Sequence, residues 1–313
     1  MIALLAQRLG SAAVTLFLVS LIIFAAVHAL PGGYADVFLG SHPTPEAKAR
    51  IEEQFGLNAP LPAQYLRWLA AAVRGDFGVS LVTQKPVAEE FALRLPVTGG
   101  IALLATILAV VIGLPAGILG GLAGPAGQST ARLAGSLAIS VPDFVIGMIL
   151  LFVVSRYGAS SGGWFADAGL GARLSAIFLP ALSLSALGAG FVMTSARHAT
   201  IGIRRGPWVM AAIARGLPTP VIALRHVVKN AAIPVVTVIS IYFGYMLGGT
   251  AIVETTFTAP GIGHYVLQAV SLRDYPVIQA AALIAAAAFV VCNLAADLLY
   301  MALDPRVRAA GAE

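Results

Sequence analysis

The chain has 313 residues, of which 59% are hydrophobic and only 11% are charged, with a formal net charge of +5. A soluble globular domain usually carries about a quarter charged residues, and one protein core cannot bury this many apolar side chains. The composition therefore excludes an ordinary soluble domain and predicts a membrane protein of the all-α class.

Six apolar stretches are long enough to cross a bilayer, which takes roughly 20 helical residues. In chain order they are Leu9–Leu30, Val97–Leu122, Leu133–Val154, Ile177–Ala196, Ala231–Val253 and Val277–Leu303. The first stretch also has features of a cleaved signal peptide, since Arg8 precedes it and the small residues Ala26 and Ala29 lie near its end. It is longer than the roughly 7–15-residue core of a signal peptide, so we expect an uncleaved helix.

These stretches divide the chain into four parts. They are a first transmembrane helix (1–30), an extracytoplasmic insertion (31–95), a core of five transmembrane helices (96–303) and a tail (304–313). Within the insertion, the apolar residues of Glu46–Phe55 and Gln64–Val73 have helical spacing. We therefore expect a small, mostly helical cap after the first transmembrane helix.

The positive charges gather on one side of the predicted membrane. Of the 19 Lys and Arg residues, ten lie before the first stretch, after the last, or in the loops that follow the second and fourth. Two acidic residues, Asp304 and Glu313, accompany them, whereas the other side is mixed in charge. Positive residues in short loops stay in the cytoplasm, so both termini are expected there. The basic excess is thus a topology signal, and we expect no nucleic-acid binding.

Motifs for catalysis or metal binding are missing from the sequence. None of the three lysines, Lys48, Lys85 and Lys229, follows a glycine, so the Gly-Lys-Ser/Thr phosphate loop of an ATPase is absent. The five histidines are scattered, and the single cysteine, Cys292, permits neither an intramolecular disulfide nor a thiolate cluster. We expect no enzyme activity, no metal site and no cofactor on this chain.

The segment Arg197–Lys229 contains six basic residues and no acidic one. A loop of this length is usually functional or disordered. Val209–Ala214 and Val221–Leu224 are apolar runs of helical character, and Gly216 and Pro218 separate them. The sequence therefore predicts a helix, a turn and a second helix at the cytoplasmic surface. Two roles stay open on these residues alone: an amphipathic element that rests on anionic lipid, or a docking site for a cytoplasmic partner.

This loop, 197–230, resembles the coupling loop of ABC-importer permeases, and more narrowly that of the dipeptide, oligopeptide and nickel branch. The matching residues are Ala211, Ala212, Gly216, Leu217, Arg225, His226, Asn230 and Pro234. Other motifs of the branch are SVPDF at 140–144, VETTFTAPGIG at 253–263, RDYP at 273–276 and LDPRVR at 303–308. Departures from the pattern are Met210 in place of an acidic residue, Gly33-Tyr34 in place of Asp-Pro, and Ala259 in place of an aromatic residue.

The resemblance implies a type I permease fold of six transmembrane helices, with both termini inside, in the bacterial plasma membrane. Such a subunit would be half of the pore of an ATP-driven importer of peptides or a similar small solute, a nickel complex included. Its implied partners are a second, homologous permease subunit, two cytoplasmic ATPase subunits that hydrolyse ATP, and an extracytoplasmic substrate-binding protein. The alternative is an ion-coupled secondary transporter or channel, which would need its own ion site.

The resemblance also assigns roles within the loop. A short coupling helix and turn would sit in a groove of an ATPase subunit and would comprise Ala211, Ala212, Arg215, Gly216 and Leu217. Residues that would brace the loop against the membrane helices are Arg225, His226, Asn230 and Pro234.

Two carboxylates, Asp143 and Asp297, fall within the predicted spans. A charge at the bilayer centre costs about 2.5–3.5 kcal/mol on insertion scales. Pro142 indicates a broken helix start, where Asp143 could face a watery pathway and contact a cationic group of the substrate. The alternative is a carboxylate satisfied by the backbone, and for Asp297 we expect a structural role. The candidate pathway and gate residues are Pro142, Asp143, Phe144, His264 and Arg273.

Overall fold

The computed structural model describes residues 2–29, 39, 44–54, 58–156, 169–204, 206–222 and 227–303. Within these ranges every regular element is a helix, and the one extended pairing is an isolated bridge between Val79 and Pro86. The all-α class is therefore confirmed for the described residues. The tail 304–313, Gly33-Tyr34, Arg225 and His226 lie outside them.

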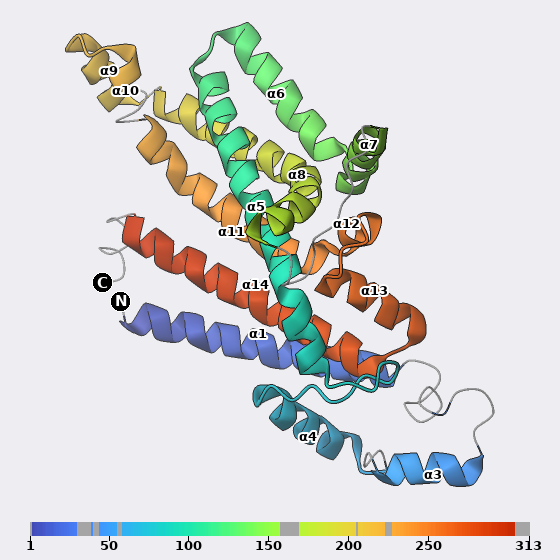
Figure 1. The fold of residues 1–313 in the computed structure, drawn as a ribbon. Helices are drawn as coiled ribbons and strands as arrows, with labels where there is room; N and C mark the ends of the chain where they lie inside the picture. Colours follow the sequence, from blue (N-terminus) through green and yellow to red (C-terminus); the bar gives the residue numbers. More distant parts are fainter. Residues whose placement is uncertain are drawn as a thin grey trace. The chain divides into compact units, whose positions relative to one another are not determined.

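The chain divides into two compact units. One comprises Val97–Ala259 with Val291–Glu313, and the other comprises Ile2–Pro96 with Pro260–Val290. Two long helices, α5 (Val87–Leu122) and α14 (Tyr275–Leu303), contribute residues to both units (Figure 1).

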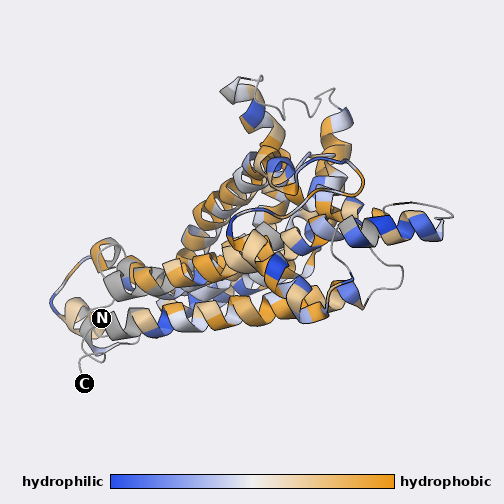
Figure 2. Cartoon of the chain, turned by 90° about the horizontal axis from the view of Figure 1, so that it is seen from below, coloured by the Kyte–Doolittle hydropathy of each residue, from blue (hydrophilic) through white to orange (hydrophobic). Residues whose placement is uncertain are grey.

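Four described helices contain a segment that is long and apolar enough to cross a membrane. These segments are Ala6–His28 in α1 (Ile2–His28), Val87–Leu122 in α5, Gly171–Arg204 in α8 (Leu170–Arg204) and Tyr275–Ala295 in α14. They cover the first, second, fourth and sixth apolar stretches of the sequence, and Figure 2 shows the long helices as mostly apolar. A multi-span membrane protein is thus supported, whereas the number six and the orientation stay predictions.

The third apolar stretch is not one straight helix. It is covered by α6 (Pro125–Ser140) and α7 (Asp143–Arg156), which meet at 89° (Figure 1). The bend lies at Pro142, where the sequence indicated a break. Proline lacks an amide hydrogen and pushes the preceding residue, here Val141, out of the helical region. The bent pair would be a fifth crossing if it counts as one span.

The fifth apolar stretch is also divided. Helix α11 (Lys229–Gly249) is followed after Thr250 by the short α12 (Ala251–Thr256). The apolar segment within α11, Pro234–Met246, is shorter than a usual span. Between α8 and α11 lie the two short helices α9 (Pro207–Ala214) and α10 (Thr219–Ile222).

Helix α8 is the centre of the first unit, because α6, α7, α11 and α12 all pack against it. Its approach to α5 depends on glycines spaced four residues apart on α5, Gly113, Gly117 and Gly121. A Cβ atom on Gly113 would lie 2.6 Å from the carbonyl oxygen of Ala189 on α8, closer than atoms can pack. Small residues at this spacing let two helix backbones come together within a membrane.

The second unit contains the helices of the insertion. Helices α3 (Pro45–Gln54) and α4 (Leu61–Val73) lie where the sequence predicts helices. Helix α4 packs on α1, and α13 (Ile262–Leu272) packs in a core with the ends of α5 and α14. This core is built from Val87, Phe91, Tyr265, Ala269, Val277 and Ala280.

Candidate functional site

The segment that resembles a coupling loop folds as a helical hairpin. Helix α9 ends at Ala214, and Gly216 follows with a left-handed backbone (φ +74°). The amide of Leu217 donates to the carbonyl of Ala212 across 3.2 Å. This bond across a left-handed glycine is the Schellman arrangement that ends many helices. The predicted helix, turn and helix are confirmed. A glycine at position 216 is favoured by the left-handed backbone of this turn, in addition to its expected role in docking.

One side of the hairpin is buried and the other is exposed. Val209 and Ala212 are buried, and they pack with Ile203, Ile222 and Val227. The opposite side presents a mixed apolar and basic surface formed by Met210, Ala211, Ala214, Arg215 and Leu217, all of which are exposed. The two adjacent alanines of the motif therefore have different surroundings. Ala211 is available to a partner, whereas Ala212 holds the hairpin together.

The hairpin begins at Pro207, three residues after the last residue of the long helix α8, Arg204. Helix α8 continues through Arg197 to Arg204, so the first residues of the predicted loop are helical. Arg204 is exposed, and its Nη1 donates to the carbonyl oxygen of Leu122, the last residue of α5, across 2.8 Å. A cation at a helix C-terminus is favourable because the terminal carbonyls carry partial negative charge.

Of the four predicted bracing residues, two are described. Asn230 and Pro234 are both exposed and lie in the first turns of α11. Proline at position 234 cannot donate the helical hydrogen bond to the carbonyl of Asn230, so the start of α11 is weakened at that point. Their bracing role, like the coupling role of the hairpin residues, stays a prediction.

Asp143 begins helix α7 and has a partner in the backbone. Its Oδ1 accepts a hydrogen bond from the amide of Phe144 across 2.8 Å, and the side chain is half-buried. The carbonyl of Pro142 accepts bonds from the amides of Val145 and Ile146. A carboxylate is stabilised at a helix N-terminus, where unpaired amides point outward. This geometry supports the backbone-satisfied alternative for Asp143. The side chain of Asp297, on α14, is not among those described.

A third carboxyl group, just outside the fifth predicted span, is the most buried one among the described side chains of this unit. Glu254 on α12 has no exposed surface. Its Oε1 accepts hydrogen bonds from the hydroxyls of Thr98 on α5, across 2.7 Å, and Thr250, across 2.8 Å. The signal available in the sequence was Thr250, one helical turn before Glu254. Buried carboxyl groups need such partners because an unpaired one is costly.

Helix α12 also packs against α7, the second helix of the bent pair. Phe257, directly after α12, is buried, and a Cβ atom on Gly147 of α7 would lie 3.0 Å from its ring. The glycine therefore lets the phenyl ring pack directly on the backbone of α7. Ala259, where the branch often has an aromatic residue, is buried in the same core.

The two predicted gate residues lie at opposite ends of α13. His264 is half-buried and its Nε2 lies 3.1 Å from the side-chain Nε2 of Gln268. Arg273 caps the C-terminus of α13 with a left-handed backbone (φ +57°) and is exposed. The structure does not bring them together with Asp143 in one unit. Their role at an entrance stays a prediction.

The neighbour of Arg273 is the residue that organises this region. Asp274 is buried; its Oδ2 accepts a 2.5 Å bond from the Ser80 hydroxyl, and its Oδ1 accepts a 3.1 Å bond from the Leu81 amide. Within the RDYP motif the sequence points to Arg273 and not to Asp274, because Ser80, the partner of Asp274, lies 194 positions away.

Three charged side chains, those of Lys85, Glu90 and Arg94, lie near Tyr265 in the same unit. Arg94 pairs with the buried Glu90, and its guanidinium lies 4.2 Å from the centre of the Tyr265 ring. Lys85 approaches Glu90 at 3.8 Å. Burial raises the pKa of the Tyr265 hydroxyl above its usual value, and the negative charges of Asp274 and Glu90 raise it further. Nearby hydroxyls of Ser80 and Thr83 act in the opposite direction, but the buried Tyr265 oxygen makes no hydrogen bond of normal geometry with the described residues.

In the part of the chain that the structure describes, no three His, Cys, Asp or Glu side chains lie close enough to hold a metal ion. The described features are an exposed helical hairpin and a bent helix pair in one unit, and three buried carboxyl groups, those of Glu254 in that unit and of Glu90 and Asp274 in the other.

Comparison with known proteins gives two family matches. The family described as binding-protein-dependent transport system inner membrane component matches residues 90–309. The N-terminal family of the same membrane components matches residues 1–102.

Several relatives align nearly end to end with this chain. The glutathione transport system permease protein GsiC of Escherichia coli strain K12 is 35% identical over 305 residues, which cover 96% of this chain and 97% of the relative. The same protein of Shigella dysenteriae serotype 1 gives the same values. The probable peptide ABC transporter permease protein y4tP of Sinorhizobium fredii is 34% identical over 307 residues, which cover 96% and 98%.

These matches confirm the resemblance drawn from the coupling motif and decide against an ion-coupled transporter or channel. In this family ATP hydrolysis takes place on separate subunits, so the chain is not an enzyme. It is a multi-pass protein of the bacterial inner membrane. The chain belongs to the family of binding-protein-dependent transport system inner membrane components, and it is the transmembrane pore subunit of an ABC importer.

Proposed function

We propose that this chain and a second, homologous permease subunit form the pathway for a short peptide of about the size of glutathione. The proposal includes six membrane spans with both termini in the cytoplasm, two ATPase subunits on the cytoplasmic side, and a substrate-binding protein on the opposite side. Support for the substrate class comes from relatives named for glutathione and peptide transport, which favours a peptide over a nickel complex.

The observation that carries the coupling part of the proposal is the two-sided hairpin. Ala212 and Val209 hold it together from within, while Ala211, Arg215 and Leu217 remain exposed next to the turn at Gly216. A small residue beside a rigid turn permits close approach of another backbone, and an adjacent arginine can pair with an acidic groove. We propose that an ATPase subunit binds this surface.

The coupling mechanism follows from how the hairpin is attached. It continues directly from α8, which carries α6, α7, α11 and α12. Movement of an ATPase that grips the hairpin would therefore be transmitted to this whole unit. Two arrangements of the pathway would then have different affinities for the nucleotide-bound ATPases, which is how binding energy on one chain shifts a conformational equilibrium on another.

The test is ATP-driven uptake by the complete transporter in proteoliposomes, with labelled glutathione and a labelled dipeptide. Ala211→Trp should abolish uptake while the transporter still folds, because the bulky ring blocks the exposed face. Ala13→Trp, also exposed but on α1, is the matched control and should transport at the wild-type rate. Wild-type uptake by the Ala211→Trp variant would refute the coupling role.

The substrate part can fail separately. If the transporter hydrolyses ATP in response to its binding protein but takes up neither glutathione nor the dipeptide, the substrate class is wrong and the coupling role stands.

A further inference from the structure

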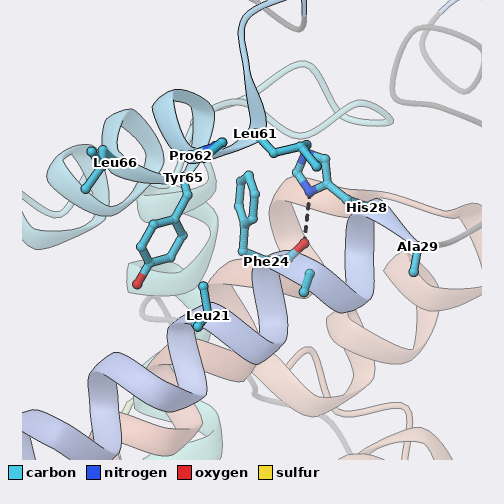
Figure 3. A pocket seen from close by; sticks show the side chains of 9 residues that line it. Leu21, Phe24, His28, Ala29, Leu61, Pro62, Tyr65 and Leu66 are labelled. Carbon is cyan, nitrogen blue, oxygen red and sulfur yellow. Dashed lines mark hydrogen bonds between the residues drawn. The ribbon is translucent and has the colours of Figure 1, made fainter.

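A groove runs between the last two turns of α1 and the first half of α4, within one unit of the chain (Figure 3). It has a volume of about 620 Å³. Sites for small ligands usually enclose roughly 300–1,000 Å³, so the groove is large enough for an extended organic chain. Nothing in the importer function described above uses it.

The walls of the groove are hydrocarbon. Leu21 and Phe24 line it from α1, and Leu61, Pro62 and Leu66 line it from α4 (Figure 3). Of these, Phe24 is buried and makes an edge-on contact with the ring of Tyr65 at 5.4 Å between centres. An apolar wall of this kind binds an apolar occupant, because removal of both surfaces from water is favourable.

The polar atoms of the lining are already occupied. The Nδ1 atom of His28 lies 2.8 Å from the carbonyl oxygen of Phe24, and the dashed line in Figure 3 marks this bond. The Nε2 atom of His28 lies 3.3 Å from Oε1 of Gln64. The hydroxyl of Tyr65 shares a 2.8 Å hydrogen bond with Ser20. A peptide or a sugar would need partners that these groups do not offer, whereas a hydrocarbon chain needs none.

The groove is continuous with an exposed, apolar surface of α1. Only 11% of the span in α1 is buried, and large apolar side chains such as Phe17 and Ile22, exposed by 50% and 66%, continue along this helix from the groove. A membrane-spanning helix of this family exposes such residues to acyl chains.

Helix α4 has the pattern of a helix that lies in the membrane interface. At 13 residues it is too short to span a bilayer, and the exposed apolar residues Pro62, Leu66 and Val73 recur at helical spacing, with Pro62 and Leu66 also lining the groove. Arg67 and Arg74 lie seven residues apart on another exposed side. Apolar residues beside basic ones are typical of helices that rest among phospholipid headgroups.

We propose that this groove binds one acyl chain of a membrane phospholipid, which fills the space between α1 and α4. The arginine side of α4 lies beside the apolar side and complements the phosphate of such a lipid. The lipid fills the space beside the direct contacts that Tyr65 of α4 makes with Ser20 and Phe24 of α1. A protein segment is the competing occupant, and the test separates the two.

The complete transporter is reconstituted with a phosphatidylethanolamine that carries a diazirine in its acyl chain, irradiated, and mapped by mass spectrometry. Cross-links on peptides that contain Leu21–Ala29 and Leu61–Leu66 should exceed those on the exposed Leu9–Leu18 part of α1 by at least about fivefold. Ala25→Leu places two methyl groups inside the groove and should reduce the enrichment to background. Ala26→Leu is the matched control, since Ala26 is exposed but does not line the groove. Equal labelling of the two variants, or no enrichment in the wild type, would overturn the proposal.

A second experiment identifies the occupant without the Ala25→Leu substitution. Benzoylphenylalanine in place of Leu66 is irradiated in the same reconstituted transporter. An adduct with the mass of a phospholipid supports the proposal, and a cross-link to another protein chain or to another segment of this chain refutes it.

Discussion

The hydroxyl of Ser80 donates a 2.5 Å hydrogen bond to the carboxylate of Asp274, although 194 positions separate the two residues in the chain. Both side chains are buried. The same carboxylate accepts bonds from the amides of Leu81 and Val82, at 3.1 and 3.4 Å. Asp274 thus links the residues before α14 to the turn before α5 through hydrogen bonds.

Removal of this acceptor should destabilise the protein. Asp274→Ala leaves the Ser80 hydroxyl and the Leu81 amide buried without a partner, at a cost of about 1–3 kcal/mol for each group. We expect a lower midpoint temperature of unfolding for the solubilised chain and a smaller loss for Asp274→Asn, whose amide oxygen still accepts. Glu89→Ala, at an exposed position on α5, is the control. A wild-type midpoint for Asp274→Ala would show that the bonds contribute nothing.

The buried carboxyl group of the other unit gives a parallel prediction. Thr98→Val keeps the shape of the side chain but removes a donor to Glu254, and should lower the free energy of unfolding by about 1–3 kcal/mol. Thr255→Val is the control, because Thr255 is exposed and its hydroxyl bonds to Ala251 in its own helix. Its effect should stay within about 0.5 kcal/mol. Similar losses from both substitutions would contradict a special role for the pair.

Two glycines of α5 should respond in opposite directions to the same change. A Cβ atom on Gly113 would lie 2.6 Å from the Ala189 carbonyl, whereas one on Gly99 would meet no atom within 4 Å. Gly99→Ala should stabilise the helix by about 0.5–1 kcal/mol, because alanine loses less chain entropy on folding. Gly113→Ala should destabilise the protein by forcing α5 and α8 apart. Thermal unfolding of the two variants checks this, and a shift of the same sign in both would disprove close contact at Gly113.

Two buried tyrosines should differ when their hydroxyls are removed. The hydroxyl of Tyr65 is bonded to Ser20, so Tyr65→Phe should cost about 0.5–1.5 kcal/mol. The hydroxyl of Tyr265 is buried without a hydrogen bond of normal geometry, so Tyr265→Phe should be neutral or stabilising near pH 7. Phenylalanine keeps the ring on which Arg94 rests. A larger loss at Tyr265 than at Tyr65 would reverse the expectation.

Tyr265 should also make the stability of the folded chain depend on pH. The pKa of Tyr265 is raised in the folded chain, chiefly by burial, above the value of about 10 that an unfolded tyrosine has. The folded state therefore keeps the proton more tightly, and this contribution is complete below pH 10 and is lost as the pH rises above it. Unfolding midpoints measured between neutral and strongly alkaline pH should fall more steeply for the wild type than for Tyr265→Phe. Parallel curves would show that Tyr265 does not contribute.

The sequence predicts the long helices well because their signal is local. Apolar runs with few or no charges mark α1, α8 and α14, and Pro142 marks the break between α6 and α7. The start of α5 was harder to place. It begins at Val87, before the apolar run at Val97, because Glu89, Glu90 and Arg94 continue the helix as polar residues.

The buried polar contacts could not be predicted in the same way. Glu254 meets Thr98 across 156 positions, and Asp274 meets Ser80 across 194. Such pairs depend on how helices pack, which no local pattern reports. The sequence predicts the hairpin that the structure shows at 207–222, but no local pattern distinguishes Ala211 from Ala212. Only the packing of Val209 and Ala212 on Ile222 separates them.

That difference supplies the most direct test of the claim that the hairpin is the joint to the ATPase. In a chain whose single cysteine is replaced by Cys292→Ser, Ala211→Cys and Ala212→Cys are each labelled with a benzophenone reagent in the complete, reconstituted transporter and irradiated. The exposed position 211 should cross-link to the ATPase subunit, and the buried position 212 should react little. Cross-links from position 211 to lipid alone would contradict the account.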